Sequence, residues 1–207
     1  MDKVTEKTFP LYDGNKSTEN LFWTEKERKQ LLETPVFNVN SIVRRSTDGR
    51  EGSFVEIATP RWVNIVPAFT GTDGKRYFVM ERQFRHGSAG ITLEFPAGLV
   101  EEDEEPESAA LRELWEETGI RAGKLTRIGV LNPNSAFMCT RGYFFIAGDL
   151  DFTGERHLDA NEQIDVVTVP ASKVFSEMGT GEMDNGIMVM SVFLYLKEKN
   201  KLCVNLS

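Results

Sequence analysis

The sequence predicts an α+β protein in which an antiparallel or mixed β-sheet is covered by helices on its faces, and three features lead to this prediction. Short segments rich in β-branched and aromatic residues dominate the chain from residue 36 onward. One clear helical pattern interrupts them near the middle, and two more follow near the C-terminus. Strands and helices do not alternate strictly, so a regular βαβ protein fits less well.

The N-terminal quarter of the chain is expected to form a separate, strand-rich piece. Thr24 and Glu27 have the spacing of a capping box, which predicts a short helix ending before Pro35. Strand patterns begin after this helix, and Thr72-Asp73-Gly74 predicts a hairpin turn between two of them. The expected strands of this half are 36–47, 53–59, 62–70, 76–84 and 91–95. We therefore expect a small unit over residues 1–50 and a main domain over 51–207.

The clearest helix is expected from Pro106 to Thr118. Proline is tolerated at a first helical position, and Gly119 is placed to end the helix. Strands are then expected at 125–131, 141–148 and 164–169, and helices at 172–178 and 187–199.

Composition excludes several classes of protein. The 207 residues carry a formal net charge of -8, which argues against nucleic acid as the main partner because nonspecific binding relies on lysine and arginine. The polar N-terminus lacks the apolar core of a signal peptide, and no later stretch is apolar enough to span a membrane, so a soluble, cytoplasmic protein is expected. Two cysteines far apart suggest neither a disulfide framework nor a zinc site.

Three glutamates share one face of the central helix. Glu113, Glu116 and Glu117 fall within an arc of about 100°. Carboxylates this close repel one another unless a cation lies among them, and hard divalent ions take such oxygen ligands together with water and phosphate. For three glutamates alone, a solvated acidic face would be the simpler reading.

The surrounding spacing resembles the Nudix box at every specified position. The matching residues are Gly98, Glu104, Arg112, Glu113, Leu114, Glu116, Glu117, Gly119 and Ile120. The resemblance implies a Nudix-type α/β/α sandwich with a mixed sheet, and a reaction in which water attacks a phosphorus of a nucleoside diphosphate linked to another group. It also implies that Glu113, Glu116 and Glu117 bind Mg²⁺ or Mn²⁺, oriented by Arg112 with Glu104 in support.

Two segments before the box resemble the ADP-ribose pyrophosphatase branch. In LEFPAG, residues 93–98, the carbonyl of Ala97 matches a backbone metal ligand of that branch. Glu94 would either touch a metal-bound water or pair with Arg112. In ERQFRHG, residues 81–87, Arg85 matches the arginine that contacts the substrate diphosphate, and its planar fork suits phosphate oxygens.

Other candidate residues lie outside these segments. Glu162 matches the loop that supplies the general base in the same branch, with Asp159 as the alternative. Pro133 is the nearest match to the proline loop that marks sugar-nucleotide preference, although its spacing from the box is short. Trp62 could stack on the base, as could Trp23 from a partner subunit.

The resemblance implies a homodimeric hydrolase of nucleoside diphosphate sugars, with ADP-ribose giving AMP and ribose 5-phosphate. Residues 1–50 resemble the small domain that such enzymes exchange between subunits. The alternatives are a Nudix hydrolase of UDP-glucose, GDP-mannose or a nucleoside triphosphate, and a sensor that binds ADP-ribose without cleaving it. An isopentenyl diphosphate isomerase fits less well, because Cys139 is not placed as its catalytic cysteine.

Overall fold

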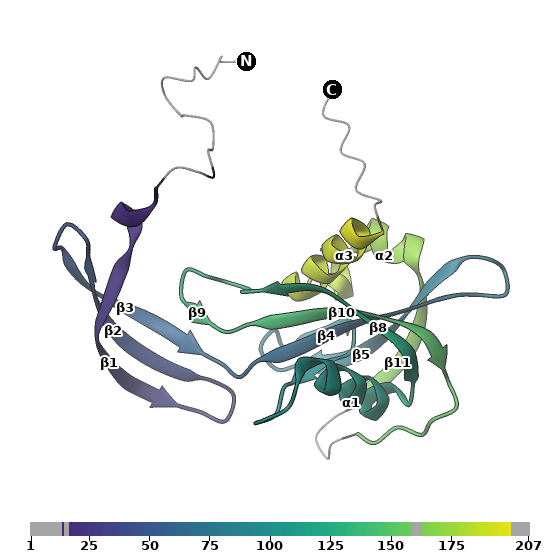
Figure 1. The fold of residues 1–207 in the computed structure, drawn as a ribbon. Helices are drawn as coiled ribbons and strands as arrows, with labels where there is room; N and C mark the ends of the chain where they lie inside the picture. Colours follow the sequence, from purple (N-terminus) through teal and green to yellow (C-terminus); the bar gives the residue numbers. More distant parts are fainter. Residues whose placement is uncertain (1–13, 15–16, 159–162, 200–207) are drawn as a thin grey trace. The chain divides into compact units, whose positions relative to one another are not determined.

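The computed structural model describes residue 14 and residues 17–158 and 163–199, and the chain divides into two compact units (Figure 1). The first unit is Met1–Ile57 and the second is Ala58–Ser207. The division falls later than the expected one after residue 50, because the strand that begins at Glu51 belongs to the sheet of the first unit.

The first unit is built from three strands. After a 3-10 turn (η1, Glu19–Leu21), strands β1 (Trp23–Glu33), β2 (Asn38–Ser46) and β3 (Glu51–Ala58) are hydrogen-bonded in this order. The predicted helix before Pro35 is wrong, since β1 pairs antiparallel with β2 from Trp23 opposite Ser46 to Glu33 opposite Asn38. Helix propensity is a weak preference, and the strand ladder overrides it here.

The second unit contains a mixed sheet of seven strands. Their order is β11-β5-β4-β10-β8, with β6 added beside β5 and β7 beside β4. Strands β4 and β10 run parallel and the other pairs are antiparallel. The bounds are β4 Trp62–Thr70, β5 Arg76–Arg85, β6 Gly90–Glu94, β7 Ala97–Leu99, β8 Arg121–Leu131, β10 Gly142–Asp151 and β11 Ile164–Pro170, with a short β9 at Met138–Cys139.

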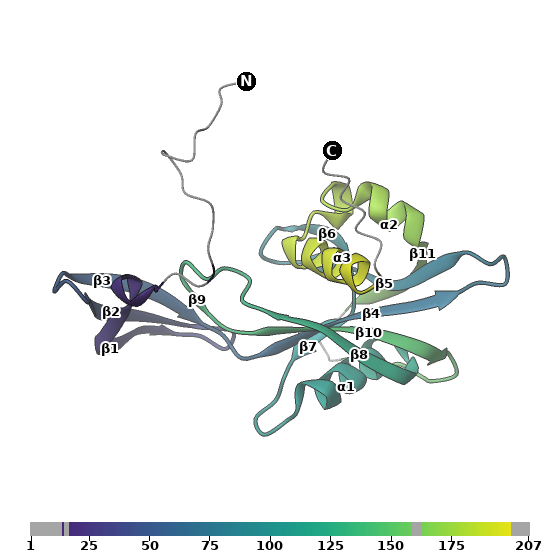
Figure 2. The same ribbon diagram turned by 45° about the horizontal axis from the view of Figure 1, so that its top comes forward.

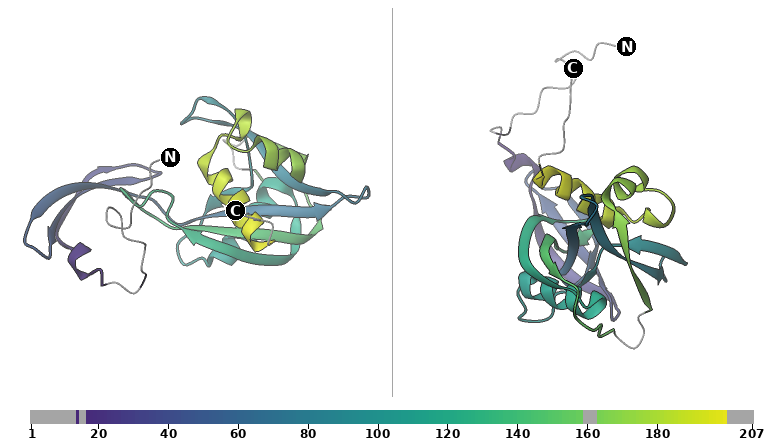
Figure 3. Two further views of the ribbon diagram at one scale, coloured as in Figure 1. Left: turned by 90° about the horizontal axis from the view of Figure 1, so that it is seen from above. Right: turned by 90° about the vertical axis from the view of Figure 1, so that its right-hand side faces the viewer.

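Helices cover both faces of this sheet, as Figure 2 shows. Helix α1 (Pro106–Thr118) packs on one face through Ala109, Ala110 and Leu114. Helices α2 (Ala171–Glu177) and α3 (Gly186–Glu198), with the 3-10 turn η2 (Gly181–Met183) between them, cover the other. Seen from above, α3 lies across the strands (Figure 3). The predicted α/β/α sandwich with a mixed sheet is confirmed.

The three predicted helices of the second unit all form. Pro106 begins α1, and Gly119 ends it in the left-handed region with φ 71°, where its N–H donates to the Trp115 carbonyl at 2.7 Å. Among the described residues, no helix has the length and apolar character needed to cross a membrane.

Candidate active site

The carboxylate of Glu113 lies directly against the backbone of β7. A Cβ added to Gly98 would be 2.0 Å from Glu113 Cδ and 2.1 and 2.3 Å from its two oxygens. Any side chain at residue 98 would occupy the space that this carboxylate fills. The glycine is therefore needed for close approach between β7 and α1.

Arg112 connects three of the acidic side chains. Its Nη1 donates to Glu113 Oε1 at 2.8 Å and to Glu116 Oε2 at 3.1 Å. Its Nε and Nη2 donate to the two oxygens of Glu104 at 3.0 and 2.9 Å, and Nη2 also reaches the Leu99 carbonyl at 3.0 Å. The Glu104 hydrogen bond is the main reason that the pKa of Arg112 is raised, and the same contact lowers the pKa of Glu104. The guanidinium is thus held in place from both sides.

Ala97 presents its backbone to Glu117, the third glutamate of the same face of α1. The Ile65 N–H donates to the Pro96 carbonyl at 2.9 Å, and Ala97 is the next residue along, opposite Asn64. Hydrogen-bonded and non-hydrogen-bonded pairs alternate in an antiparallel ladder, so the N–H and carbonyl of Ala97 are directed away from β4. The N–H donates to Glu117 Oε2 at 3.1 Å. The carbonyl is therefore directed toward the side on which Glu117 lies.

A second group of buried charges lies on β5 and β6. Glu81 and Glu94 are directly opposite each other in the strand pairing, and both are buried. Arg85 donates two hydrogen bonds to the Glu94 carboxylate, from Nε at 3.1 Å and from Nη2 at 2.9 Å. The charges of Glu94, Glu117 and Glu81 all act on Arg85. The two acidic groups, one centred on α1 and one on β5 and β6, are therefore electrostatically coupled through this arginine, and the Ala97 N–H, three residues after Glu94, joins Glu117 to the same segment.

This second group corrects one expectation and adds one residue. Glu94 pairs with Arg85 and not with Arg112. Glu81 was missed in the sequence, although its spacing of two and four from Gln83 and Arg85 puts all three on one face of a strand. The signal in the sequence was that a charged residue, Glu81, directly follows the apolar run 77–80.

The Glu94 carboxylate is charged despite its burial. Burial is the largest influence on its pKa and acts to raise it, but hydrogen bonds from Arg85, Thr92 and Asn185 and the Arg85 charge outweigh that influence. The net pKa lies below the ordinary value of 4.5. Glu94 and Arg85 thus form a partly buried ion pair at neutral pH.

The donor atoms around α1 suit a hard divalent ion. Carboxylate oxygens of Glu113, Glu116 and Glu117 and the Ala97 carbonyl are the oxygen ligands that Mg²⁺ and Mn²⁺ take. In the structure, Arg112 donates hydrogen bonds to the carboxylates of Glu113 and Glu116, and the Ala97 N–H donates one to Glu117. Accordingly, no three Asp, Glu, His or Cys side chains within the described ranges converge closely enough to hold an ion. The types of ligand nevertheless fit a divalent metal ion.

The chain segment after β10 docks on the C-terminal end of α1. The His157 N–H donates to the Glu116 carbonyl at 2.8 Å, and the His157 ring packs on Trp115 at a centroid distance of 4.5 Å. This segment leads towards both candidate bases, Glu162 and Asp159, which lie outside the described residues.

The structure does not bring Trp62 to the face that α1 covers. Neighbouring Val63 and Ile65 pack with α1, so strand alternation turns Trp62 to the opposite face. There its ring packs edge-on against Phe144 at 5.4 Å and lies across Gly142. Pro133 lies in the turn between β8 and β9. Packing within the sheet accounts for Trp62 without a substrate.

Residues 59–187 match the model of the NUDIX domain family. The chain belongs to the NUDIX domain family. Nudix hydrolases generally use divalent metal ions, in agreement with the oxygen ligands gathered around α1 of this Nudix domain.

Relatives of this Nudix chain include pyrophosphatases. It is 35% identical over 122 residues to an ADP-ribose pyrophosphatase of Bacillus subtilis, and the match covers 58% of this chain and 66% of that protein. It is 44% identical over 59 residues to an ADP-sugar pyrophosphatase of Mus musculus, covering 28% of this chain and 27% of that one. The chain thus spans less than two thirds of the length of either relative.

A solved structure shares the fold of this chain. The crystal structure of an ADP compounds hydrolase superposes with a TM-score of 0.73 and covers 87% of this chain and 97% of that one. At 22% sequence identity, this likeness concerns the fold alone.

Proposed function

We propose that this Nudix chain hydrolyses the pyrophosphate bond of nucleoside diphosphate sugars, with ADP-ribose giving AMP and ribose 5-phosphate, and that it depends on Mg²⁺ or Mn²⁺. The observation that carries the proposal is the meeting of the Nudix-box carboxylates on α1 with the Arg85–Glu94 pair on β5 and β6. The names of the relatives from Bacillus subtilis and Mus musculus support the substrate class.

The residues that would hold the metal are Glu113, Glu116 and Glu117, together with the Ala97 carbonyl. Bound divalent ions supply charge neutralisation for the diphosphate and activation of water. Arg112 would orient the carboxylates of Glu113 and Glu116 through its Nη1 atom, because Glu104 fixes the Nε and Nη2 edge of the guanidinium. Its role is to orient carboxylates, and it needs no contact with substrate.

Arg85 would bind the diphosphate. Its Nε and Nη2 atoms are used by Glu94, and its side chain is 42% exposed, whereas that of Glu94 is 2% exposed. A guanidinium fixed along one edge can present its remaining N–H groups to phosphate oxygens. Glu94 therefore serves to aim Arg85.

The reaction needs a group that takes a proton from water as the water oxygen attacks phosphorus and the bond to the leaving phosphate breaks. We assign this role to Glu162, with Asp159 as the alternative. Replacing each acid separately by its amide distinguishes them, because only loss of the base removes the acidic limb of the pH–rate profile.

The test of the proposed function is a substrate panel. The purified chain is incubated with Mg²⁺ and ADP-ribose, UDP-glucose, GDP-mannose and dinucleoside polyphosphates, and the products are identified by mass. The expected result is AMP and ribose 5-phosphate from ADP-ribose, with turnover abolished by EDTA and restored by Mg²⁺ or Mn²⁺. Binding of ADP-ribose without turnover would identify a sensor, and turnover of GDP-mannose or UDP-glucose alone would change the substrate assignment.

A matched pair of variants on α1 tests the site. Glu116→Gln should lower kcat by orders of magnitude with little change in Tm, since a partly exposed carboxylate outside the core rarely matters for stability. Glu107→Gln is the control, because Glu107 lies on the same helix and pairs only loosely with Arg127, at 3.5 Å. Equal activity in the two variants would remove Glu116 from the metal site.

The first unit supports the further proposal of a homodimer. Among its described residues, only Ile42 is a buried hydrophobic, while the exposed large apolar side chains are Leu21, Phe22, Leu31, Leu32, Val36, Phe54 and Val55. An apolar surface of this kind on a small unit usually meets a partner. We propose that the partner is a second copy of this chain.

A further inference from the structure

The segment from Glu94 to Ala97 connects the two halves of the candidate site, and its Pro96 carbonyl accepts the Ile65 N–H from β4 at 2.9 Å. Its side chains point to opposite faces of the sheet: Glu94 pairs with Arg85, and Phe95 is fully buried in the core beneath α3. Pro96 has no N–H, so the N–H groups of Phe95 and Ala97 are the segment's available donors after Glu94. What those two N–H groups bind, together with the hydrogen bond from Ile65 to the Pro96 carbonyl, fixes the path of the backbone.

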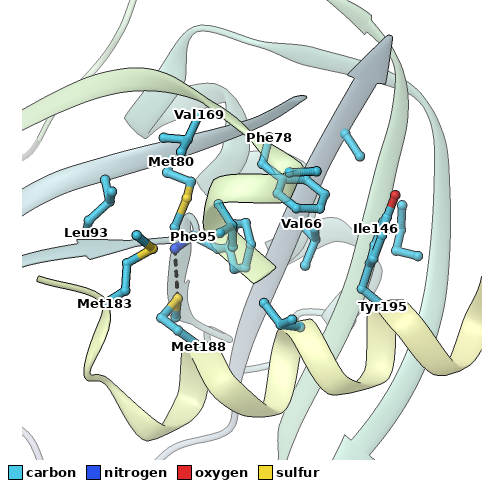
Figure 4. Packing of buried hydrophobic residues seen from close by; sticks show 14 residues of the cluster. Val66, Phe78, Met80, Leu93, Phe95, Ile146, Val169, Met183, Met188 and Tyr195 are labelled. Carbon is cyan, nitrogen blue, oxygen red and sulfur yellow. Dashed lines mark hydrogen bonds between the residues drawn. The ribbon is translucent and has the colours of Figure 1, made fainter. Parts of the chain in front are cut away.

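The Phe95 N–H donates to a thioether. Met188, on the first turn of α3, is 1% exposed, and its Sδ lies 2.9 Å from Phe95 N (Figure 4). A buried backbone N–H requires an acceptor, and sulfur is a weak one that a methionine supplies without adding charge. Other methionines of the same core, Met80 and Met183, pack nearby without a hydrogen bond of this kind.

The same turn of α3 also reaches Glu94. Asn185 caps the helix through its Oδ1, which accepts the Ile187 N–H at 2.9 Å. Its side chain also helps to hold the pKa of the Glu94 carboxylate below its ordinary value. Asn185 at the N-cap and Met188 on the first turn of α3 therefore act on two consecutive residues of the segment, Glu94 and Phe95.

We propose that Met188 is a positioning residue of the active site, which acts through the Phe95 N–H to fix the backbone that presents the Ala97 carbonyl beside Glu117. The inference rests on the proposed function, because it treats that carbonyl as a metal ligand. Ala97 lies two residues after Phe95, and its own N–H donates to Glu117 Oε2 at 3.1 Å. Met188 and Glu117 thus hold the segment from opposite faces of the sheet.

The test compares Met188→Leu with Met183→Leu. Leucine keeps the volume and apolar character of methionine but offers no acceptor, and Met183 belongs to the same buried cluster. Mn²⁺ binding to the protein without substrate is measured by electron paramagnetic resonance. We expect about tenfold weaker Mn²⁺ binding in Met188→Leu, as for loss of an outer contact to a metal ligand, and wild-type binding in Met183→Leu. Equal Mn²⁺ affinity in the two variants would overturn the proposal.

A second readout separates this inference from the proposed function. Amide hydrogen exchange at Ala97, followed by NMR, should be faster in Met188→Leu and unchanged in Met183→Leu. Wild-type exchange at Ala97 in Met188→Leu rejects the positioning role, whatever the protein binds. If the wild-type protein neither binds Mn²⁺ nor cleaves any diphosphate, the proposed function fails, and the exchange rates still decide whether Met188 positions the segment. In an active protein, the Met188→Leu defect should lie in the Mn²⁺ concentration for half-maximal rate and be relieved at saturating Mn²⁺.

Discussion

Replacement of Gly98 by alanine should disable the site without unfolding the protein. The new Cβ would lie 2.0 Å from Glu113 Cδ, and ordinary contact begins at 3.4 Å, so the carboxylate must retreat by at least 3.4 - 2.0 = 1.4 Å. The obstructing atoms are the end of a flexible side chain, so they can move. In moving, the carboxylate leaves the 2.8 Å hydrogen bond to Arg112 Nη1.

The effect on activity should be far larger than the effect on stability. A displacement of about 1 Å in a reacting group can cost about 100-fold in rate, so kcat/KM should fall by about 100-fold or more. The backbone at Gly98 lies outside the left-handed region, so alanine adds no backbone strain. Alanine lowers unfolded-chain entropy, which offsets part of the lost hydrogen bond, and the net change should stay within about 1 kcal/mol.

The assay measures ADP-ribose hydrolysis, Mn²⁺ affinity and Tm for Gly98→Ala beside a control. Gly148→Ala in β10 is suitable, because a Cβ there meets nothing within 4 Å. Both variants should keep Tm within about 4 °C of the wild type, and only Gly98→Ala should lose activity and Mn²⁺ affinity. Wild-type kcat/KM in Gly98→Ala would show that the position of the Glu113 carboxylate does not matter, and would refute the reasoning.

Two further predictions concern stability and assembly. The folded pKa of Glu94 is below its ordinary value of 4.5, so its pairing with Arg85 stabilises the protein fully above that pH, and this stabilisation is lost as the pH falls through the lower folded pKa. Glu94→Gln should therefore lower the free energy of unfolding at pH 7 by about 1 kcal/mol. It should also flatten the decline of Tm below about pH 4.5. An unchanged acid profile of Tm by calorimetry would contradict this prediction. The homodimer predicts twice the chain mass in sedimentation at micromolar concentration, and a monomer at every concentration would disprove it.

The metal-ligand half of the site follows from local spacing. Glu113, Glu116 and Glu117 share a helix face because a helix has 3.6 residues per turn, and Gly98 and Arg112 stand at fixed offsets in the same continuous segment. The three helices and the longer strands of the second unit followed from the same short-range patterns, whereas the short strands β7 and β9 were not predicted. Such features need no knowledge of which distant segments meet.

Other features depended on distant parts of the chain. The segment after Trp23 has the composition of a helix, but pairing with β2 makes it a strand. Glu81 joins the site only because β5 pairs with β6 in the register that puts Glu94 opposite it. Met188 reaches Phe95 only because α3 folds back onto the sheet. Strand register and packing between layers are set by the whole core, so short-range periodicity could not supply these three contacts.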